Sequence, residues 1–202
     1  MSQKSKDKII KSAIEIISKK GYSAATTSEI AQAAGYSEAT IFKYFNSKKG
    51  LFDAVINSFT DNIAESVGLP GVRSIIKNDA DLEFDEIVDL IVEDRIRFIE
   101  SNYDFLKILL AEIQFHEGLR NKAIEHILMP VLEDATELIK KQIKIGNIKE
   151  VDPVILFRTI FAGIFMSILP RMLMNKPLDI KVLKEELEEV KKIFLHGAIK
   201  VK

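Results

Sequence analysis

Apolar residues recur at a helical period along almost the whole chain. Between residues 7 and 20 they fall three or four positions apart, and Gly21 follows where a helix can end in the left-handed region. The same period predicts further helices near residues 48–66, 84–101, 103–117, 120–145, 153–174 and 180–199. No stretch of useful length alternates apolar and polar residues as a half-buried strand would. The pattern therefore predicts an all-α fold of about nine helices.

Two short helices are predicted between residues 26 and 45. Thr26 and Glu29 have the spacing of a capping box, and Gly35 is placed to end the helix that they open. Ser37 is expected to cap the next helix, which runs to about Phe45. Two short helices separated by Gly-Tyr-Ser are typical of a helix-turn-helix.

The second of these short helices has a predicted inner and outer face. Ile41, Phe42 and Phe45 are expected to point inward. The residues left outside are Glu38, Ala39, Lys43 and Tyr44. We therefore expect residues 1–47 to form a helix-turn-helix domain and residues 48–202 to form a second, helical domain.

Helix breakers and caps mark the remaining elements. Ser47 is expected to open the helix after the helix-turn-helix, and residues 69–83 have the composition of a loop. Pro130 should kink the helix that contains it. Asp152, followed by proline, and Asp179 are expected N-caps of the last two helices.

Charge is distributed unevenly between the two ends of the chain. Residues 1–50 contain nine lysines and four acidic residues, a net charge of +5, whereas the whole chain carries −1. A basic module joined to an acidic body is typical of a protein whose basic end meets a polyanion. A chance clustering of solvated lysines is the alternative.

Several function classes lack support in the sequence. There are no cysteines, and the three histidines are far apart, so we expect no metal site, no cofactor and no enzymatic activity. The polar, basic first eleven residues do not have the pattern of a signal peptide. The longest nearly uncharged stretch, residues 159–170, is about half the length of a membrane span. These features favour a cytoplasmic protein without a membrane partner.

The segment 8–52 resembles a known family. The matching motifs are KIIKSA (8–13), KGY (20–22), TTSEIA (26–31), AGYS (34–37), TIFKYF (40–45) and KKGL (48–51). In order and spacing they are similar to the N-terminal domain of the tetracycline-repressor (TetR) family. The resemblance covers less than a quarter of the chain. It implies a three-helix DNA-binding domain, a helical regulatory domain, a homodimer and a pseudopalindromic double-stranded operator.

The exposed side of the second short helix is suited to the major groove. Lys43 could donate to guanine, the Ala39 methyl could contact a thymine methyl, and Glu38 could accept from cytosine N4. For Glu38, stabilisation of the helix dipole is an equal alternative.

Other residues of the motif are suited to phosphates. The expected phosphate-contacting residues are Thr27, Ser37, Thr40, Tyr44 and Lys48, which supply hydroxyls or charge near helix starts. The family commonly has tyrosine at the position of Phe42, where its hydroxyl reaches a phosphate. Phe42 cannot make that bond, so either the contact is lost or Tyr44 and Tyr36 replace it, and Phe42 is expected in the core.

The last two helices are predicted to form the dimer interface. Helix 153–174 is apolar nearly all round, so it needs partners on both sides. By the resemblance, it and the final helix would pair with their symmetry mates. The expected interface residues are Gly163, Leu187, Val190 and Phe194. Packing within one protomer is the alternative.

Large apolar side chains are predicted to line a pocket for a small apolar effector. The candidate lining is Phe59, Ile63, Phe98, Phe105, Leu109, Ile113, Met129, Phe161, Phe165 and Met166. Ordinary core packing is the alternative for each of them. The polar groups that could orient a ligand are Glu112, Gln114, His116 and Arg95.

Together these features predict a ligand-responsive DNA-binding regulator. We expect a repressor whose unliganded dimer occupies its operator and whose effector releases it. The alternatives are an activator and a DNA-binding or interaction protein that is controlled by a protein partner without a small ligand.

Overall fold

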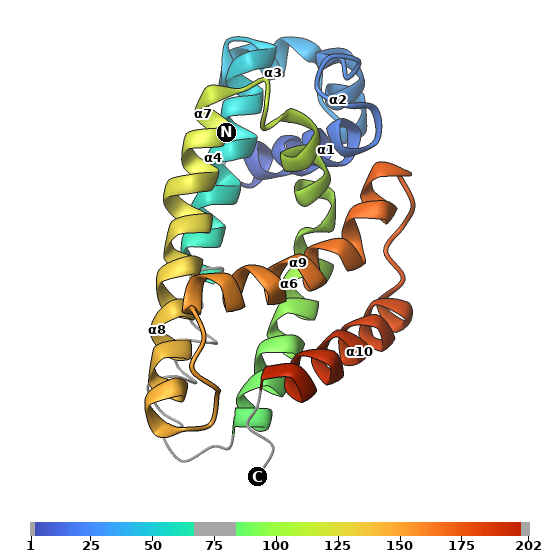
Figure 1. Ribbon diagram of the computed structural model, residues 1–202. Coiled ribbons are helices and arrows are strands. Elements are labelled where there is room, and N and C mark those ends of the chain that lie inside the picture. The colour runs from blue at the N-terminus through green and yellow to red at the C-terminus, as the bar shows by residue number, and fades with distance from the viewer. Residues whose placement is uncertain (1–2, 67–83, 199–202) are drawn as a thin grey trace. The chain divides into compact units, whose positions relative to one another are not determined.

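The computed structural model describes residues 3–66 and 84–198, with the side chains of residues 3–58 and 84–195. The loop expected over residues 69–83 lies outside this part of the chain. The described elements are α1 (Gln3–Lys20), α2 (Thr27–Ala34), α3 (Glu38–Phe45), α4 (Lys48–Ser66), α6 (Phe84–Glu112), α7 (Glu117–Ala123), a π-helical turn (Ile124–Leu128), α8 (Met129–Ile145), α9 (Pro153–Leu173) and α10 (Ile180–Ala198). No β-strand occurs among these residues, so the predicted all-α fold is confirmed (Figure 1).

The chain divides into two compact units. The first is formed by Met1–Glu65 and Asn102–His126, and the second by Ser66–Ser101 and Ile127–Lys202. The first unit therefore contains α4 and the segment 102–126 in addition to the predicted helix-turn-helix domain. The helix α6 contributes residues to both units.

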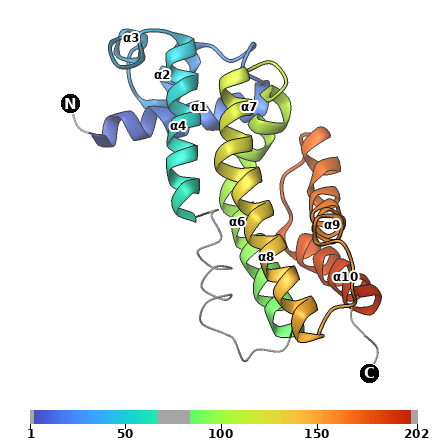
Figure 2. The same cartoon turned by 60° about the vertical axis from the view of Figure 1, so that its left-hand side comes forward.

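The core of the first unit forms where the apolar stripes of its helices meet. Its fully buried side chains include Ile9, Ala13, Ile30, Ile41, Phe52, Val55 and Ile108. Figures 1 and 2 both show α2 and α3 grouped at the start of α4. The predicted start of the next helix at Ser47 is confirmed, because α4 begins at Lys48 and the Gly50 N–H donates to Ser47 Oγ at 2.9 Å.

The predicted break near residue 102 is wrong. We expected separate helices over 84–101 and 103–117, but α6 runs without interruption from Phe84 to Glu112. Ser101 and Asn102 have only moderately low helix propensity, which is insufficient to stop a helix whose buried stripe continues through Ile99, Tyr103 and Ile108.

A π-helical turn precedes Pro130. The expected helix 120–145 is instead α7, the turn Ile124–Leu128 and α8, in which the proline occupies the first turn. Pro130 lacks an N–H and cannot continue the ordinary ladder from the preceding turn. The structure therefore has a change of helix type before the proline, where a kink within one helix was expected.

The second unit packs α9 against both α8 and α10 (Figure 2). The predicted N-caps are confirmed, since Asp152 accepts from the N–H of Val154 and Asp179 accepts from that of Lys181. An ion pair joins α10 to α6, because Lys191 Nζ lies 2.5 Å from Asp89, and the same atom also lies 2.5 Å from Glu188 on α10 itself. The pKa of Lys191 is raised, mainly by the hydrogen bond to Asp89 and next by the one to Glu188.

Candidate nucleic-acid interface

Caps at both ends of α2 fix the start of the helix-turn-helix. Thr26 Oγ1 accepts from the Glu29 N–H, and Glu29 Oε2 accepts from the Thr26 N–H, both at 3.2 Å. The pKa of Glu29 is lowered, mainly by the hydrogen bond from Lys20 and next by those from Thr26. At the other end Gly35 has φ 74° and donates its N–H to the Gln32 carbonyl at 3.0 Å. The predicted capping box and left-handed glycine are therefore confirmed.

The helix α3, the second of the helix-turn-helix, is anchored by one face and leaves the other open. Ile41 and Phe45 are buried, while Ala39 and Lys43 are exposed as predicted. Phe42 was expected in the core, but 45% of it is exposed, so that prediction is wrong. Ile41 and Phe45 lie four residues apart on one face, whereas Phe42 follows Ile41 by about 100° around the axis. The exposed face of α3 therefore carries an aromatic ring.

Hydroxyl groups gather at the start of α3. Ser37 stands at the N-cap position but makes no side-chain cap, so that predicted bond is wrong. Its hydroxyl instead lies 2.9 Å from that of Thr40. Tyr44 is half-buried, as is Tyr36, whose ring lies 5.8 Å from Lys8 Nζ.

Thr27 and Glu38 contact each other rather than pointing separately outward. Thr27 is only 8% exposed, and its Oγ1 donates to Glu38 Oε1 at 2.5 Å. The prediction that the Thr27 hydroxyl faces a phosphate is wrong in this structure, because the hydroxyl already has an internal acceptor. Glu38 itself is exposed at the first position of α3.

Lys48 also has internal partners at the start of α4. Its ammonium donates to the Ser23 carbonyl at 3.0 Å and lies 4.7 Å from the centre of the Tyr22 ring. The side chain therefore ties the loop between α1 and α2 to α4. Lys48 remains half-exposed, so its charge still contributes to the surface.

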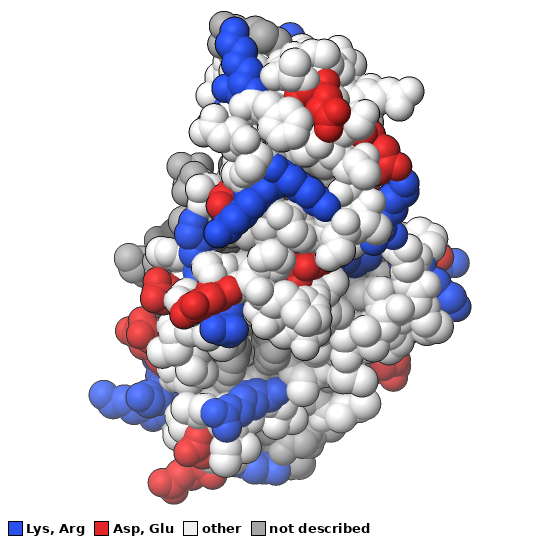
Figure 3. Space-filling view, turned by 90° about the horizontal axis from the view of Figure 1, so that it is seen from above, with Lys and Arg blue, Asp and Glu red and all other residues white. Residues whose placement is uncertain are grey.

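The positive charge of residues 1–50 is partly neutralised. Lys19 pairs with Glu15 at 2.8 Å, and Lys20 pairs with Glu29 at 2.6 Å. Figure 3 shows Lys and Arg side chains separated by uncharged surface, with acidic side chains among them. Two of the nine lysines of residues 1–50 are therefore paired with carboxylates.

A buried glutamate joins the end of α6 to the loop before α2. Glu112 Oε1 accepts from the Tyr22 N–H at 2.8 Å, and Oε2 lies 3.3 Å from His116 Nε2. The Tyr22 ring packs against Phe52, with 4.5 Å between ring centroids, and against His116 at 5.1 Å. Burial, then the charges of Asp53 and Glu112, raise the pKa of Tyr22. The polar residues expected to orient a ligand, Glu112 and His116, therefore contact the helix-turn-helix instead.

The predicted pocket lining is divided between the two units. Phe105, Leu109 and Ile113 lie in the first unit, where Phe105 is buried. The second unit contains Phe98, Met129, Phe161, Phe165 and Met166. Phe59 and Ile63 lie outside the residues with described side chains. Among the other groups expected near a ligand, Arg95 pairs with Asp94 and Gln114 is exposed.

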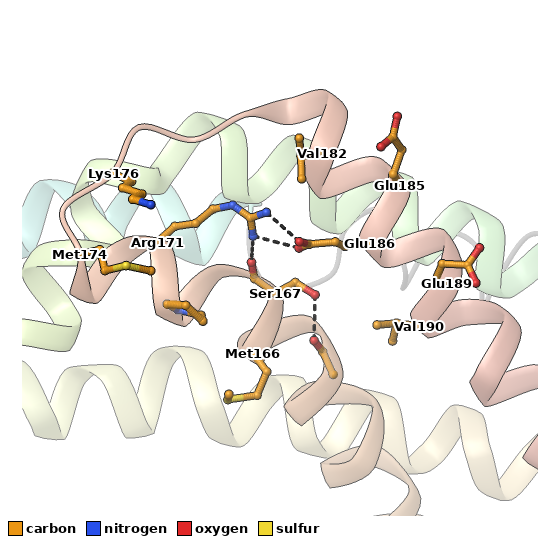
Figure 4. Close-up of a pocket in the computed structure, with 12 residues that line it drawn as sticks. Met166, Ser167, Arg171, Met174, Lys176, Val182, Glu185, Glu186, Glu189 and Val190 are labelled. Atoms are coloured by element: carbon orange, nitrogen blue, oxygen red, sulfur yellow. Dashed lines mark hydrogen bonds and ion pairs between the residues drawn. The ribbon is translucent and has the colours of Figure 1, made fainter.

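Two hollows in the described residues differ from the predicted pocket. A cavity of about 410 Å³ in the first unit has Phe52, Ile56 and Leu119 among its lining, and none of the ten predicted residues. An open groove of about 830 Å³ between α9 and α10 includes Met166 (Figure 4). The apolar effector site stays a prediction.

The predicted interface residues mostly pack within their own protomer. Leu187 is 1% exposed, so it has no surface left for a partner, and its assignment to the interface is wrong. The Phe194 ring packs against Phe84, with centroids 6.0 Å apart. Gly163 and Val190 both line the groove between α9 and α10, where they lie close together. These residues pack internally because the apolar side of α10 covers α9 and α6 of the same chain.

A different face of α9 is exposed. The exposed Arg158 lies beside its uncharged members, which recur at helical spacing: Ile155, Thr159, Ala162, Met166, Pro170 and Leu173. We call this set the α9 stripe. Ile155, Met166 and Leu173 are 62%, 56% and 71% exposed. By length and composition alone α9 could also cross a membrane, yet Arg171 near its end makes a two-pronged ion pair with Glu186 on α10 (Figure 4).

Gly163 permits α9 and α10 to approach closely. A Cβ at this position would lie 2.8 Å from Val190 Cγ1. We expect Gly163→Ala to lower the free energy of unfolding, because overpacking outweighs the gain in helix propensity. In a Val190→Ala background the same substitution should instead stabilise the protein by up to about 1 kcal/mol. Chemical denaturation of the wild-type protein, the two single variants and the double variant measures this sign change. If Gly163→Ala changed the free energy of unfolding equally in both backgrounds, the close approach would be contradicted.

Comparison with known proteins identifies the N-terminal segment. Residues 9–55 match the family described as bacterial regulatory proteins of the tetR family. The N-terminal segment therefore has the sequence of the tetR family. The helix-turn-helix-type transcriptional regulator YvkB of Bacillus subtilis is 46% identical over 55 residues. That match spans 27% of this chain and 29% of the relative.

Longer matches extend beyond the DNA-binding segment. The fatty acid metabolism regulator protein of B. subtilis is 27% identical over 168 residues, which are 83% of this chain and 82% of the relative. The solved structure of the TetR-family regulator PfmR from Thermus thermophilus has a TM-score of 0.73 and 20% identity, covering 93% of this chain and 97% of that one. FadR from B. subtilis in complex with stearoyl-CoA has a TM-score of 0.68 and 23% identity, covering 95% and 98%. These structures establish a shared TetR-family fold.

Proposed function

We propose that the protein is a TetR-family transcriptional repressor that binds operator DNA as a homodimer and is released by a small, mainly apolar effector. The observation that carries this proposal is the architecture of α2 and α3. Capped helices hold α3 by Ile41 and Phe45 and leave Ala39 and Lys43 open. A short helix held in this way fits the major groove, where its exposed side chains reach base edges.

Two lysines should have separable roles in DNA binding. We expect Lys43→Ala to lower operator affinity by about 1–3 kcal/mol and to relax the preference at one base position. Lys48→Ala should weaken binding to all sequences alike, because the lysine charge contacts a phosphate and not a base. It should also reduce the slope of log affinity against log salt concentration by about 1. Lys48→Ala should also remove the hydrogen bond to the Ser23 carbonyl, so the melting temperature of this variant is measured in parallel. Binding isotherms at several salt concentrations distinguish the two variants.

The matched control for these variants is Lys19→Ala. Lys19 is exposed in the same unit but pairs with Glu15 on α1, so its loss should leave base preference unchanged. A Lys48 variant with altered base preference and an unchanged salt slope would contradict the assignment.

The α9 stripe is proposed to pack against a second copy of the chain. A symmetric dimer places two recognition helices on half-sites one helical turn, about 34–36 Å, apart. The stripe supports this because it is uncharged and exposed along six positions of one helix face. TetR-family regulators bind operators as dimers, and an isolated uncharged stripe of this length is otherwise a solubility liability.

Glu112 is proposed to transmit effector binding to the DNA-binding helices. Its buried carboxylate holds the backbone N–H of Tyr22, one residue after the left-handed Gly21 that ends α1. A movement of α6 at this end therefore acts directly on the loop that precedes α2. Since a ligand shifts an equilibrium only through different affinities for the two states, the effector must prefer the arrangement that does not fit DNA.

The relatives favour an effector with a long acyl chain. A protein 27% identical over most of this chain regulates fatty acid metabolism by its description, and a solved regulator structure of the same fold contains stearoyl-CoA. The large, adaptable Phe and Met side chains of the C-terminal helices suit such a chain. Linkage requires operator DNA to weaken acyl-CoA binding by the same factor by which acyl-CoA weakens operator binding.

A further inference from the structure

The contact between Thr27 and Glu38 joins the first residues of the two helices of the helix-turn-helix. Thr27 begins α2 and is buried, while Glu38 begins α3 and is exposed. The hydroxyl donates to one carboxylate oxygen, Oε1, at 2.5 Å. A hydrogen bond of this length to an ionised acceptor is of the strong, charge-assisted kind.

This bond leaves the carboxylate ordered but not saturated. An ionised carboxylate has two oxygens and about four acceptor sites. Thr27 occupies one site on Oε1, and the structure records no hydrogen bond to Oε2 among the described residues. A free glutamate at this position would sample many rotamers, whereas the bond to a buried neighbour restricts it. Stabilisation of the α3 dipole alone would not require this partner, since position in the first turn is sufficient for it.

The ordered acceptor fits one base better than the others. In the major groove, cytosine presents the N4 amino donor, and guanine and thymine present only acceptors on their hydrogen-bonding edges. Adenine presents its N6 donor beside the N7 acceptor, which would repel a carboxylate. A negatively charged group held at the start of the recognition helix therefore discriminates for cytosine and against the acceptor-bearing edges.

We propose that Thr27 is a positioning residue that holds the Glu38 carboxylate so that its free oxygen accepts from cytosine N4 in each operator half-site. Thr27 acts through Glu38 and does not itself touch the DNA. This inference rests on the proposed function, because it concerns how the same surface selects sequence. It differs from a phosphate contact in its consequence, since positioning affects one base pair and a phosphate contact affects all sequences.

The test compares full-length variants on DNA selected from a random library. The wild-type protein defines the motif, and affinities are then measured for the motif and for single base-pair changes. We expect Thr27→Val to reduce discrimination at the cytosine position about three- to tenfold, as expected when one side chain loses its pre-ordering. Binding to unrelated DNA and the salt slope should stay unchanged. Thr27→Ser retains the hydroxyl and should keep wild-type discrimination.

A double-variant comparison separates positioning from loss of structure. Glu38→Ala should abolish discrimination at the cytosine position, and adding Thr27→Val should then have no further effect there. Circular dichroism and melting temperature confirm that the Thr27 variants are folded. Equal weakening on all sequences with a lower salt slope would overturn the proposal in favour of a phosphate contact. Unchanged discrimination in Thr27→Val or in Glu38→Ala would overturn it as well. If the wild-type protein enriched no motif, the proposed function itself would fail before any variant is compared.

Discussion

Replacing Met166 by glutamate should convert the protein into a monomer and lower its operator affinity by about 10²–10⁴-fold. Met166 lies near the centre of the α9 stripe and is 56% exposed in the protomer. A carboxylate there is tolerated by the isolated chain but would be buried without a partner in the dimer. Once the dimer is lost, the second half-site is no longer bound by an attached copy. Sedimentation and binding isotherms on the same samples measure both effects.

The control for this variant changes charge at an exposed site outside the α9 stripe. Lys140→Glu on α8 reverses a charge at an exposed position, and it should leave the dimer intact. The Met166 variant should keep its helical content, because the side chain contributes little to the protomer core. If it sedimented as a dimer with wild-type operator affinity, the interface would not lie on this face.

Replacing Glu112 by alanine should separate effector binding from DNA release. The variant leaves the part-buried Tyr22 N–H without its acceptor, which should lower the free energy of unfolding by about 1–3 kcal/mol. A long-chain acyl-CoA should still raise the melting temperature. We expect it to lower operator affinity tenfold or more in the wild-type protein, a coupling of about 1.4 kcal/mol, and to have little effect in the variant. Fluorescence anisotropy of labelled operator, titrated with acyl-CoA, measures this coupling.

Glu117→Ala is the matched control for the Glu112 variant. Glu117 is exposed at the start of α7 and belongs to the same unit. Its loss should leave both stability and coupling near the wild-type values. Full acyl-CoA response in Glu112→Ala would show that the signal reaches the DNA-binding helices by another route.

Helix caps could be predicted from the sequence because they depend on residues that are close together in the chain. The capping box of Thr26 and Glu29, the left-handed Gly35 and the N-caps Asp152 and Asp179 all involve bonds across two to four residues. Such bonds leave a fixed spacing in the sequence. The all-α fold and the positions of α2 and α3 were predictable for this reason.

Faces of helices were harder to predict than the helices themselves. Phe42 is apolar, yet α3 is too short to bury a second face, so the ring is exposed. Leu187 has the spacing of an interface residue, but that spacing does not distinguish a partner in the same chain from one in another chain. The choice depends on which helix covers that face, and that information lies in the tertiary packing.

Contacts between distant residues left no signal in the sequence. The bond from Tyr22 to Glu112 spans 90 positions, and that between Thr27 and Glu38 spans 11 across a turn. Glu112 could be recognised only as a carboxylate near an apolar stripe, which suggested a ligand contact. Thr27 was predicted to contact a phosphate because it supplies a hydroxyl near a helix start. Both assignments changed when the structure supplied the partner atoms.

The central claim is that the exposed face of α3 reads a specific operator as part of a dimer. The most direct test is to sequence genomic and random DNA fragments retained by the purified protein at physiological salt. We expect one enriched pseudopalindrome with half-sites about one helical turn apart, bound at least about 10³-fold more tightly than unrelated DNA. Retention of fragments without a common motif, with an affinity ratio near one, would contradict the claim.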